Sequence, residues 1–156
     1  MARSTFSDLD CSIARTLDIV GSRWTLLVLR DLFGGITRFD AIQADLGISR
    51  KVLAERLSSL EQAGVVERRA YQDNPPRYDY VLTEKGSELG AVLLAMIAWG
   101  DRWEAGPDGP PALFRHEQCG QVTHAVAACS ECGEPLDRGN ITRVTPPGSR
   151  SEPAAA

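Results

Sequence analysis

The sequence has no apolar run long enough to cross a bilayer, and its first residues contain no secretory core. We therefore expect no contact with a membrane and a cytoplasmic location. Only two histidines occur in 156 residues, and the sequence shows no phosphate loop, no pairing of a nucleophile with a base and no convincing pair of carboxylates. These absences disfavour an enzyme. No internal repeat is present either, and the hydrophobic content of 43% is ordinary for one globular core with a small appendage.

An excess of positive charge is also lacking, since the net charge is −4. This balance mildly disfavours binding to a polyanion such as DNA, because phosphates need cations. The charges are distributed unevenly, however: residues 104–156 hold seven acids and four bases, whereas residues 49–69 hold five bases and three acids. Salt screens charges that are more than about 8–10 Å apart, so the local excess of bases matters more than the total.

Residues 39–83 follow the order helix, short turn, helix and two strands. The turn is Gly47-Ile48-Ser49. Gly47 can take the left-handed conformation that ends a helix, Ile48 can fill the crevice between the two helices, and Ser49 can cap the second helix. Two helices at a steep angle followed by a β-hairpin form a winged helix-turn-helix, whose commonest use is to read duplex DNA. The predicted fold is therefore mainly α with a small β-hairpin wing (α+β).

Hydrophobic periodicity and turn residues place the other elements. The helix over residues 23–33 is apolar nearly all round, which predicts a buried central helix. Thr37 to Asp40 resembles a capping box, with Asp in place of Glu, at the start of the third helix. Thr83 is the predicted cap of the last long helix. The expected helices cover residues 12–20, 23–33, 39–46, 49–63 and 84–103, and the expected strands cover residues 65–71 and 77–82.

The helix over residues 49–63 is the candidate recognition helix. Leu53, Leu57 and Leu60 share the face expected to meet the core, so the polar face points the other way. The amino-terminal half of such a helix usually enters the major groove. A solvated polar face is the alternative for each single residue. The candidate DNA contacts are Ser49, Arg50, Lys51 and Glu55, with Arg56 beside the core stripe as a candidate phosphate contact.

The predicted wing carries Arg68, Arg69 and Arg77. Arg77 follows two prolines, so it is expected to project from a rigid turn toward a phosphate or the minor groove. The alternative is a surface arginine paired with Asp73 or Asp79. We favour DNA contact for Arg77 over contact for the other two arginines.

Several segments with characteristic spacing surround these elements. They are Cys11 to Gly21, Arg23 to Leu32, Arg38-Phe39, Gly47-Ile48-Ser49, Leu53 to Leu57, Pro75 to Tyr80 and Leu82 to Gly86. Together they closely resemble the HxlR-type bacterial transcriptional regulators, over about residues 8–103. The resemblance implies a sequence-specific regulator, expected to be a repressor, that binds an inverted-repeat operator in double-stranded DNA as a homodimer. It also implies that the first and last helices build the dimer interface, and that some members respond to aldehyde, quinone or other electrophile stress.

The apolar surface of the last predicted helix also favours a homodimer. It carries more apolar surface, including Trp99 and Trp103, than one small winged helix needs to cover. A twofold dimer would set two recognition helices ~34 Å apart, which is one turn of DNA. The alternative is that this helix folds back on its own domain.

Cys11 lies just before the first helix, where exposed amides and the helix dipole favour a thiolate. Arg15 would favour the thiolate further, whereas Asp8 and Asp10 would oppose it. In some HxlR-type regulators a cysteine at the matching position senses oxidants or electrophiles, so the resemblance makes Cys11 a candidate redox or electrophile switch at the dimer interface. An electrophile or other small molecule is accordingly a candidate effector. The alternative is a small buried apolar residue.

The other three cysteines lie in the tail, where residues 104–112 read as a linker, residues 113–144 as a compact module and residues 145–156 as disordered. His116-x2-Cys119-Gly120 and Cys129-x2-Cys132-Gly133 are two short knuckles whose three thiolates and one imidazole suit a tetrahedral Zn²⁺. We expect a structural zinc ion in a zinc-ribbon-like appendage that draws much of its folding energy from the metal. The hairpin of this appendage is expected over residues 121–128, and His124 is a spare ligand.

The sequence of the tail also allows other interpretations. Cys129 and Cys132 could form a redox pair, or the same thiolates could make a regulatory metal or oxidant sensor. The HxlR-type resemblance does not extend over this segment. For the whole chain, the alternatives to a transcriptional regulator are a winged-helix and zinc-ribbon module that binds proteins, which the acidity fits, and, less favoured, a thiol oxidoreductase.

Overall fold

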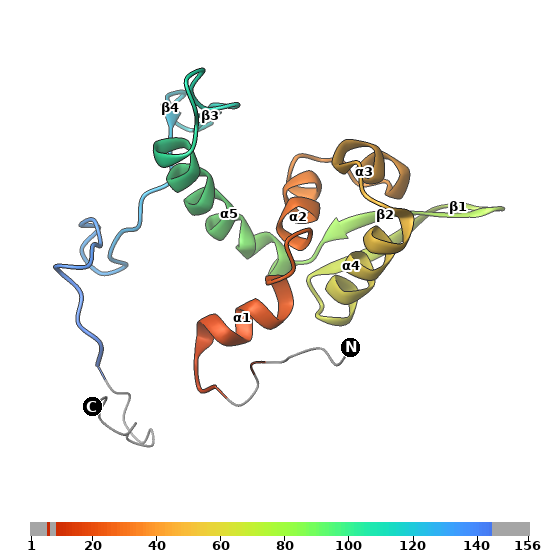
Figure 1. Ribbon diagram of the computed structural model, residues 1–156, viewed down its shortest axis with the longest axis horizontal. Helices are drawn as coiled ribbons and strands as arrows, with labels where there is room; N and C mark the ends of the chain where they lie inside the picture. The colour runs from red at the N-terminus through yellow and green to blue at the C-terminus, as the bar shows by residue number, and fades with distance from the viewer. Residues whose placement is uncertain (1–5, 7–8, 145–156) are drawn as a thin grey trace. The chain divides into compact units, whose positions relative to one another are not determined.

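The computed structural model describes residue 6 and residues 9–144 of the chain (Figure 1). Asp8 and the disorder expected over residues 145–156 lie outside this part. The chain forms two compact units, which divide within a long helix between Ile97 and Ala98. In chain order the elements are α1 (Ser12–Val20), α2 (Thr25–Phe33), α3 (Phe39–Leu46), α4 (Arg50–Gln62), β1 (Val66–Asp73), β2 (Pro76–Leu82), α5 (Glu84–Trp103), β3 (Phe114–Arg115) and β4 (Val122–Thr123). Among the described residues, none of these helices combines the length and apolar character that crossing a bilayer requires.

The core of the first unit lies between α2, α3, α4 and the base of the hairpin. The predicted stripe of α4 is buried, and Ile48 fills the turn between α3 and α4 as expected. The prediction that α2 is buried on every face was wrong, because Leu27 and Phe33 are more than one third exposed. The buried core residues are Val20, Val28, Leu29, Leu32, Ile42, Ile48, Leu53, Leu57, Leu60, Val65 and Val66.

The turn between α3 and α4 has the predicted chemistry. Gly47 closes α3 at φ 61° and ψ 26°, a left-handed conformation that favours glycine. Ser49 is the N-cap of α4, and its Oγ accepts a hydrogen bond of 3.2 Å from the amide of Val52. The helix-turn-helix geometry is therefore encoded in three consecutive residues.

The capping box expected at the start of α3 does not form. The N-cap is Arg38, and no side chain caps the helix. Thr37 instead donates its hydroxyl to Asp79 Oδ1 at 2.9 Å, and its carbonyl accepts from the amide of Tyr80 at 2.8 Å. The threonine thus joins the segment before α3 to strand β2, because β2 passes close enough to compete for its hydroxyl.

Strands β1 and β2 form the antiparallel wing, in a register that runs from Val66–Leu82 to Asp73–Pro76 with an irregularity between Ala70 and Gln72. Both strands reach further toward the tip than predicted, since only residues 74 and 75 remain for the turn. Figure 1 shows the hairpin extending beyond the helices of its unit.

Helix α5 has the predicted bounds, and Thr83 caps it as expected. The hydroxyl of Thr83 accepts from the amide of Gly86 at 3.1 Å and donates to the carbonyl of Gly64 at 2.7 Å. A Cβ atom at Gly86 would lie 2.1 Å from the carbonyl oxygen of Val65, so no larger residue fits there without a backbone shift. This glycine allows the start of α5 to pack against the start of the wing.

Candidate nucleic-acid interface

The amino end of α4 presents polar side chains at the surface. Ser49, Arg50, Lys51 and Glu55 are all exposed. The Arg50 guanidinium lies 4.8 Å from the centre of the Phe39 ring, and its Nη1 is 3.5 Å from Asp40 Oδ1. Lys51 forms no ion pair within the described residues. The helix therefore offers one cation held against α3 and a second cation available to a ligand.

Arg56 differs from the other candidates on α4. Its side chain is only 20% exposed, and its Nη2 lies 3.7 Å from Glu55 Oε2. The guanidinium is thus largely occupied next to the core stripe, which makes it a poorer candidate for a phosphate contact than Arg50 or Lys51.

Two of the three wing arginines form ion pairs with nearby glutamates, whereas the third does not among the described residues. Arg68 Nε donates to Glu61 Oε1 at 2.6 Å, and Arg69 Nη2 lies 2.7 Å from Glu67 Oε1. Arg77 is exposed near the wing tip and has no ion pair within the described part of the chain. The geometry therefore leaves Arg77 available to a ligand, and its contact with DNA stays a prediction.

Arg38 is a surface cation that the sequence reasoning missed. It lies at the N-cap of α3, with its side chain 65% exposed, 3.7 Å from Asp79 Oδ1 and 4.7 Å from the centre of the Tyr71 ring. It therefore lies where the helix-turn-helix meets the wing. The only signal in the sequence was a base directly before the first helix of the motif.

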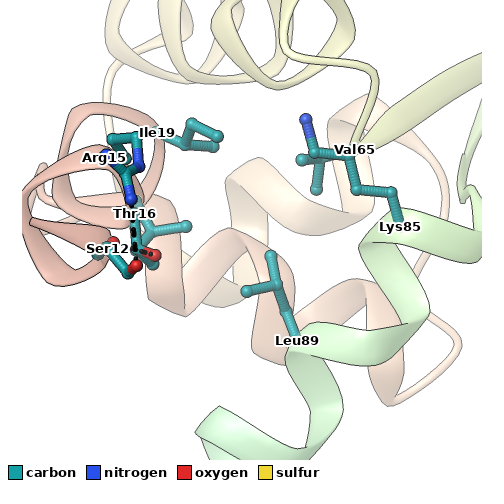
Figure 2. Close-up of a pocket in the computed structure, with 8 residues that line it drawn as sticks. Ser12, Arg15, Thr16, Ile19, Val65, Lys85 and Leu89 are labelled. Atoms are coloured by element: carbon teal, nitrogen blue, oxygen red, sulfur yellow. Dashed lines mark hydrogen bonds between the residues drawn. The ribbon is translucent and has the colours of Figure 1, made fainter. Parts of the chain in front are cut away.

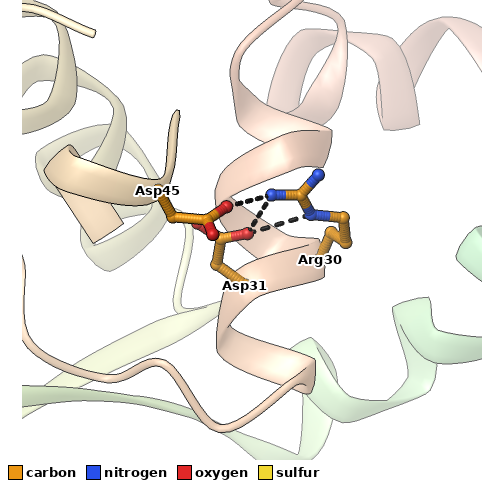
Figure 3. Close-up of polar contacts among 3 residues, drawn as sticks. All are labelled: Arg30, Asp31 and Asp45. Atoms are coloured by element: carbon orange, nitrogen blue, oxygen red, sulfur yellow. Dashed lines mark hydrogen bonds and ion pairs between the residues drawn. The ribbon is translucent and has the colours of Figure 1, made fainter. Parts of the chain in front are cut away.

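A cluster of charged side chains ties α2 to α3 behind this surface. Figure 3 shows Arg30 of α2 directed at Asp31 of the same helix and at Asp45 of α3. Arg30 Nη2 lies 2.6 Å from Asp31 Oδ1 and 2.5 Å from Asp45 Oδ2. Asp31 is buried, and within the described residues its Oδ2 has no hydrogen-bond partner. Burial raises the pKa of the Asp31 carboxyl, against the lowering effect of Arg30.

Cys11 is exposed at the N-cap of α1, so it is not a buried apolar residue in the single chain. Its side chain makes no capping hydrogen bond. Arg15, which was expected to favour the thiolate, instead bonds to Asp10 Oδ1 and to Ser12 Oγ, both at 3.1 Å. The thiol is therefore accessible but lacks the direct cationic partner that the sequence suggested.

A pocket of about 300 Å³ lies between α1 and the start of α5. Figure 2 shows side chains of α1 on one side and Lys85 and Leu89 on the other. Its two cations are engaged, because Lys85 Nζ donates to the carbonyl of Ala63 at 2.7 Å and Arg15 bonds to Asp10. The lining residues are Ser12, Arg15, Thr16, Ile19, Val20, Val65, Lys85 and Leu89.

The predicted zinc ligands of the second unit form two separate pairs. His116 Nδ1 lies 3.3 Å from Cys119 Sγ. Hydrogen bonds from the backbone of Cys132, from the backbone of Glu131 and from the Cys132 side chain lower the pKa of the Cys129 thiol. Among the described residues, no group of three or more metal-ligating side chains is close enough to hold an ion. The structure thus brings each pair together but does not join the pairs.

The hairpin expected over residues 121–128 does not form. Instead β3 pairs with β4 around the first knuckle, and an isolated bridge joins Ala128 to Pro135 around the second. The tight turns expected at the knuckles are therefore themselves the hairpin turns, and the residues between the knuckles do not pair with each other as a hairpin.

The helix-turn-helix, the exposed amino end of its second helix and the cation near the wing tip define a winged-helix DNA-binding protein. The pattern of the HxlR-like helix-turn-helix family matches residues 19–107. The chain therefore belongs to this family and is a transcriptional regulator of its type.

Relatives of known sequence or structure agree with this assignment. Rv3095 of Mycobacterium tuberculosis, an uncharacterised HTH-type transcriptional regulator, is 39% identical over 145 residues, which cover 93% of this chain and 92% of Rv3095. The crystal structure of PA1607, a candidate transcription factor, superposes with a TM-score of 0.79 at 31% identity, over 91% of this chain and 99% of PA1607. Reduced YodB of Bacillus subtilis gives a TM-score of 0.52 at 39% identity, over 62% of this chain and 96% of YodB.

Two details of these matches bear on the sites. YodB has also been crystallised in diamide-treated and quinone-bound forms. The family pattern ends at residue 107, but the match to Rv3095 covers 145 of 156 residues and so includes the segment over residues 116–132. The cysteine-bearing segment therefore belongs to a stretch that this chain shares with a relative. These relatives are transcriptional regulators, a class of proteins that are not enzymes.

Proposed function

We propose that this chain is a homodimeric, sequence-specific repressor that binds an inverted-repeat operator. The observation that carries the proposal is the exposed amino end of α4, where Ser49, Arg50 and Lys51 lie at the surface of a helix-turn-helix. Such a helix end matches the dimensions of the major groove. The available cation of Arg77 near the wing tip suits a phosphate or the minor groove.

The roles of the polar residues follow from their surroundings. Lys51 can contact a base or phosphate, because no carboxylate of the described residues holds its charge. Arg50 stacks on Phe39 and pairs with Asp40, which orients its guanidinium as a partly fixed donor. Glu55 can accept a hydrogen bond from a cytosine amino group. Arg38 supplies a further phosphate contact between helix and wing.

Dimerisation is supported by apolar side chains that one chain leaves uncovered. Ile13 and Leu17 of α1 are 71% and 43% exposed, and Val92 and Met96 of α5 are 42% and 49% exposed. Each pair is spaced four residues apart, so each lies on one face of its helix. Apolar faces of this kind are usually covered by a partner. A twofold axis through α1 and α5 would place the two α4 helices ~34 Å apart, in successive major grooves.

The proposed activity can be tested by titrating the full chain with DNA that flanks its own gene. We expect tighter binding to this DNA than to a scrambled duplex of equal length, and a steep loss of affinity with salt. Lys51→Ala should weaken specific binding by about 1–3 kcal/mol. Gln62→Ala, a change at the carboxy end of the same helix, should bind like the wild type. Equal affinity for both duplexes would refute sequence specificity.

We further propose that oxidants or electrophiles release the operator through Cys11. The forms in which YodB was crystallised support this idea, as does the exposure of Cys11 at the start of the proposed interface helix α1. A modified thiol at this position would disturb the packing of α1 against the partner. Diamide should then lower the operator affinity of the wild type but not of Cys11→Ser, and equal release of both proteins would remove Cys11 from the mechanism.

A further inference from the structure

The cysteine-bearing segment contains the same backbone turn twice. The first turn, the first knuckle, covers residues 116–121. The amide of His116 donates to the carbonyl of Gln121 at 2.9 Å, and the amide of Gly120 donates to the carbonyl of His116 at 2.7 Å. Gly120 has φ +70°, a conformation that side chains larger than hydrogen rarely adopt. The β3–β4 ladder closes directly outside this turn.

The second knuckle covers residues 129–134 and repeats each of these features. The amide of Cys129 donates to the carbonyl of Glu134 at 2.8 Å, and the amide of Gly133 donates to the carbonyl of Cys129 at 2.8 Å. Gly133 has φ +78°. The hydrogen bonds and the left-handed glycine thus fall at the same positions as in the first knuckle.

The residues that flank the knuckles match as well. Arg115 pairs with Val122 around the first turn, and Ala128 pairs with Pro135 around the second. In each case these are the residue before the turn and the residue after it. The shared backbone therefore presents the first and fourth residues of both knuckles in the same way, although the two sequences are identical only at the fourth-position cysteine and the glycine after it.

The first and fourth residues are the candidate ligands. His116 Nδ1 and Cys119 Sγ are 3.3 Å apart. Two such atoms on one tetrahedral Zn²⁺ would be about 3.5 Å apart, because Zn–N and Zn–S bonds are about 2.0–2.1 and 2.3 Å long. The first pair therefore already has nearly the separation of two adjacent ligands. Cys129 and Cys132 occupy the corresponding positions of the second knuckle.

Burial of apolar side chains does not explain how residues 113–144 keep the two turns folded. Within the described residues 113–144, no residue is buried. Leu113, Val122 and Val126 are 69%, 62% and 71% exposed. Two-stranded hairpins without a hydrophobic face are marginal in water, and segments this small commonly depend on metal or disulfides. A further source of folding free energy is therefore needed.

We propose that the two knuckles close on one Zn²⁺ ion per chain, with His116, Cys119, Cys129 and Cys132 as its four ligands. Three thiolates and one imidazole form a common structural zinc set. The two pairs lie apart in the structure, but residues 124–127, which join the β3–β4 ladder to the Ala128–Pro135 bridge, can span about 3.3–3.6 Å each. This connection lets the two knuckles turn to face one another. Closure on the ion would give the segment the core that its side chains do not provide.

The test is metal analysis of the full chain, purified with Zn²⁺ present and then dialysed. We expect one zinc ion per chain, with only Cys11 reacting freely with a thiol reagent. Replacing zinc by Co²⁺ should give the visible absorption of a tetrahedral site and a thiolate-to-cobalt charge-transfer band for three sulfurs. Protein without zinc whose tail thiols all titrate freely would overturn the proposal, and half an ion per chain would overturn a site within one chain.

Variants identify the ligands. Cys119→Ser and Cys132→Ser should lose the bound zinc, whereas the matched controls Cys11→Ser and His124→Ala should keep it. His116→Cys should retain one ion and add a fourth sulfur to the cobalt charge-transfer band, a result that a merely structural histidine would not give. Retention of zinc by Cys119→Ser or Cys132→Ser with wild-type affinity would refute the assigned ligands. Because wild-type stoichiometry and the cobalt spectrum need no variant, the proposal stays testable if one variant fails to fold.

Discussion

Asp79 on the wing accepts a hydrogen bond of 2.9 Å from the hydroxyl of Thr37, which lies just before α3. Arg38 lies 3.7 Å from the same carboxylate, and the amide of Tyr80 bonds to the carbonyl of Thr37. The wing is thereby attached to the first helix of the helix-turn-helix as well as to the end of α4. These contacts hold the two proposed DNA-contacting parts in one orientation.

Replacing Asp79 with Ala should loosen this attachment. We expect unfolding to become easier by about 1 kcal/mol, as for the loss of one hydrogen bond between side chains, and operator affinity to fall because the wing is no longer positioned. Chemical denaturation and DNA titration measure the two effects. Asp73→Ala removes an equal charge nearer the wing tip and should leave stability unchanged. The same operator affinity for both variants would contradict a positioning role for Asp79.

Arg77 and Arg69 offer a matched comparison on the wing. Arg77 has no ion pair in the described part of the chain, whereas Arg69 pairs with Glu67 at 2.7 Å. Arg77→Ala should therefore weaken operator binding and reduce the slope of log affinity against log salt by about 1.8, because a dimer loses two phosphate contacts worth about 0.9 each. Arg69→Ala should change both quantities less. Binding measured from low to moderate salt tests this, and an unchanged slope for Arg77→Ala would exclude a phosphate contact.

The dependence of stability on pH should reveal the buried carboxyl of Asp31. Burial raises its pKa in the folded protein above the ordinary value. In the window between these two values the folded state binds more protons than the unfolded state, so the contribution of Asp31 to stability grows as the pH falls. The free energy of unfolding of the wild type should therefore rise relative to that of Asp31→Asn as the pH is lowered through this window. Denaturant titrations of both proteins over this range test it; a constant or falling difference would contradict the prediction.

The apolar side chains exposed on α5 give a test of the proposed dimer. Met96→Glu places a charge on the exposed apolar face and should shift the protein toward monomer, with a parallel loss of operator affinity. Ser87→Glu adds the same charge on the opposite side of the helix and should stay dimeric. Sedimentation velocity of both variants is the measurement. A Met96→Glu protein that remains fully dimeric would place the interface elsewhere.

How well the sequence predicts a contact depends on how far apart the two contacting residues are along the chain. Gly47, Ser49 and Thr83 act on backbone groups a few residues away, and each was predicted correctly. Thr37 was misread because the partner of its hydroxyl is 42 residues further along the chain. A local pattern cannot show which of two acceptors will lie nearer in the folded protein.

In the candidate site, too, local features were predictable from the sequence and contacts between distant segments were not. Exposure of Lys51 follows from helical periodicity, and the structure agrees with it. The pairing of Arg68 with Glu61 depends on where β1 crosses the end of α4, which periodicity does not determine. In the tail, the ligand spacing was visible in the sequence. The matching hydrogen bonds of the two knuckles were not, because they involve backbone atoms.

A hydroxyl-radical footprint of the full chain on DNA flanking its own gene tests the central claim most directly. Two α4 helices on one face of the duplex predict two protected half-sites related by a twofold axis, with their centres about one helical turn, or ~34 Å, apart. Lys51→Ala should weaken both half-sites together. A single unrepeated protected stretch, or uniform protection along every duplex, would contradict a dimer that reads an operator through α4.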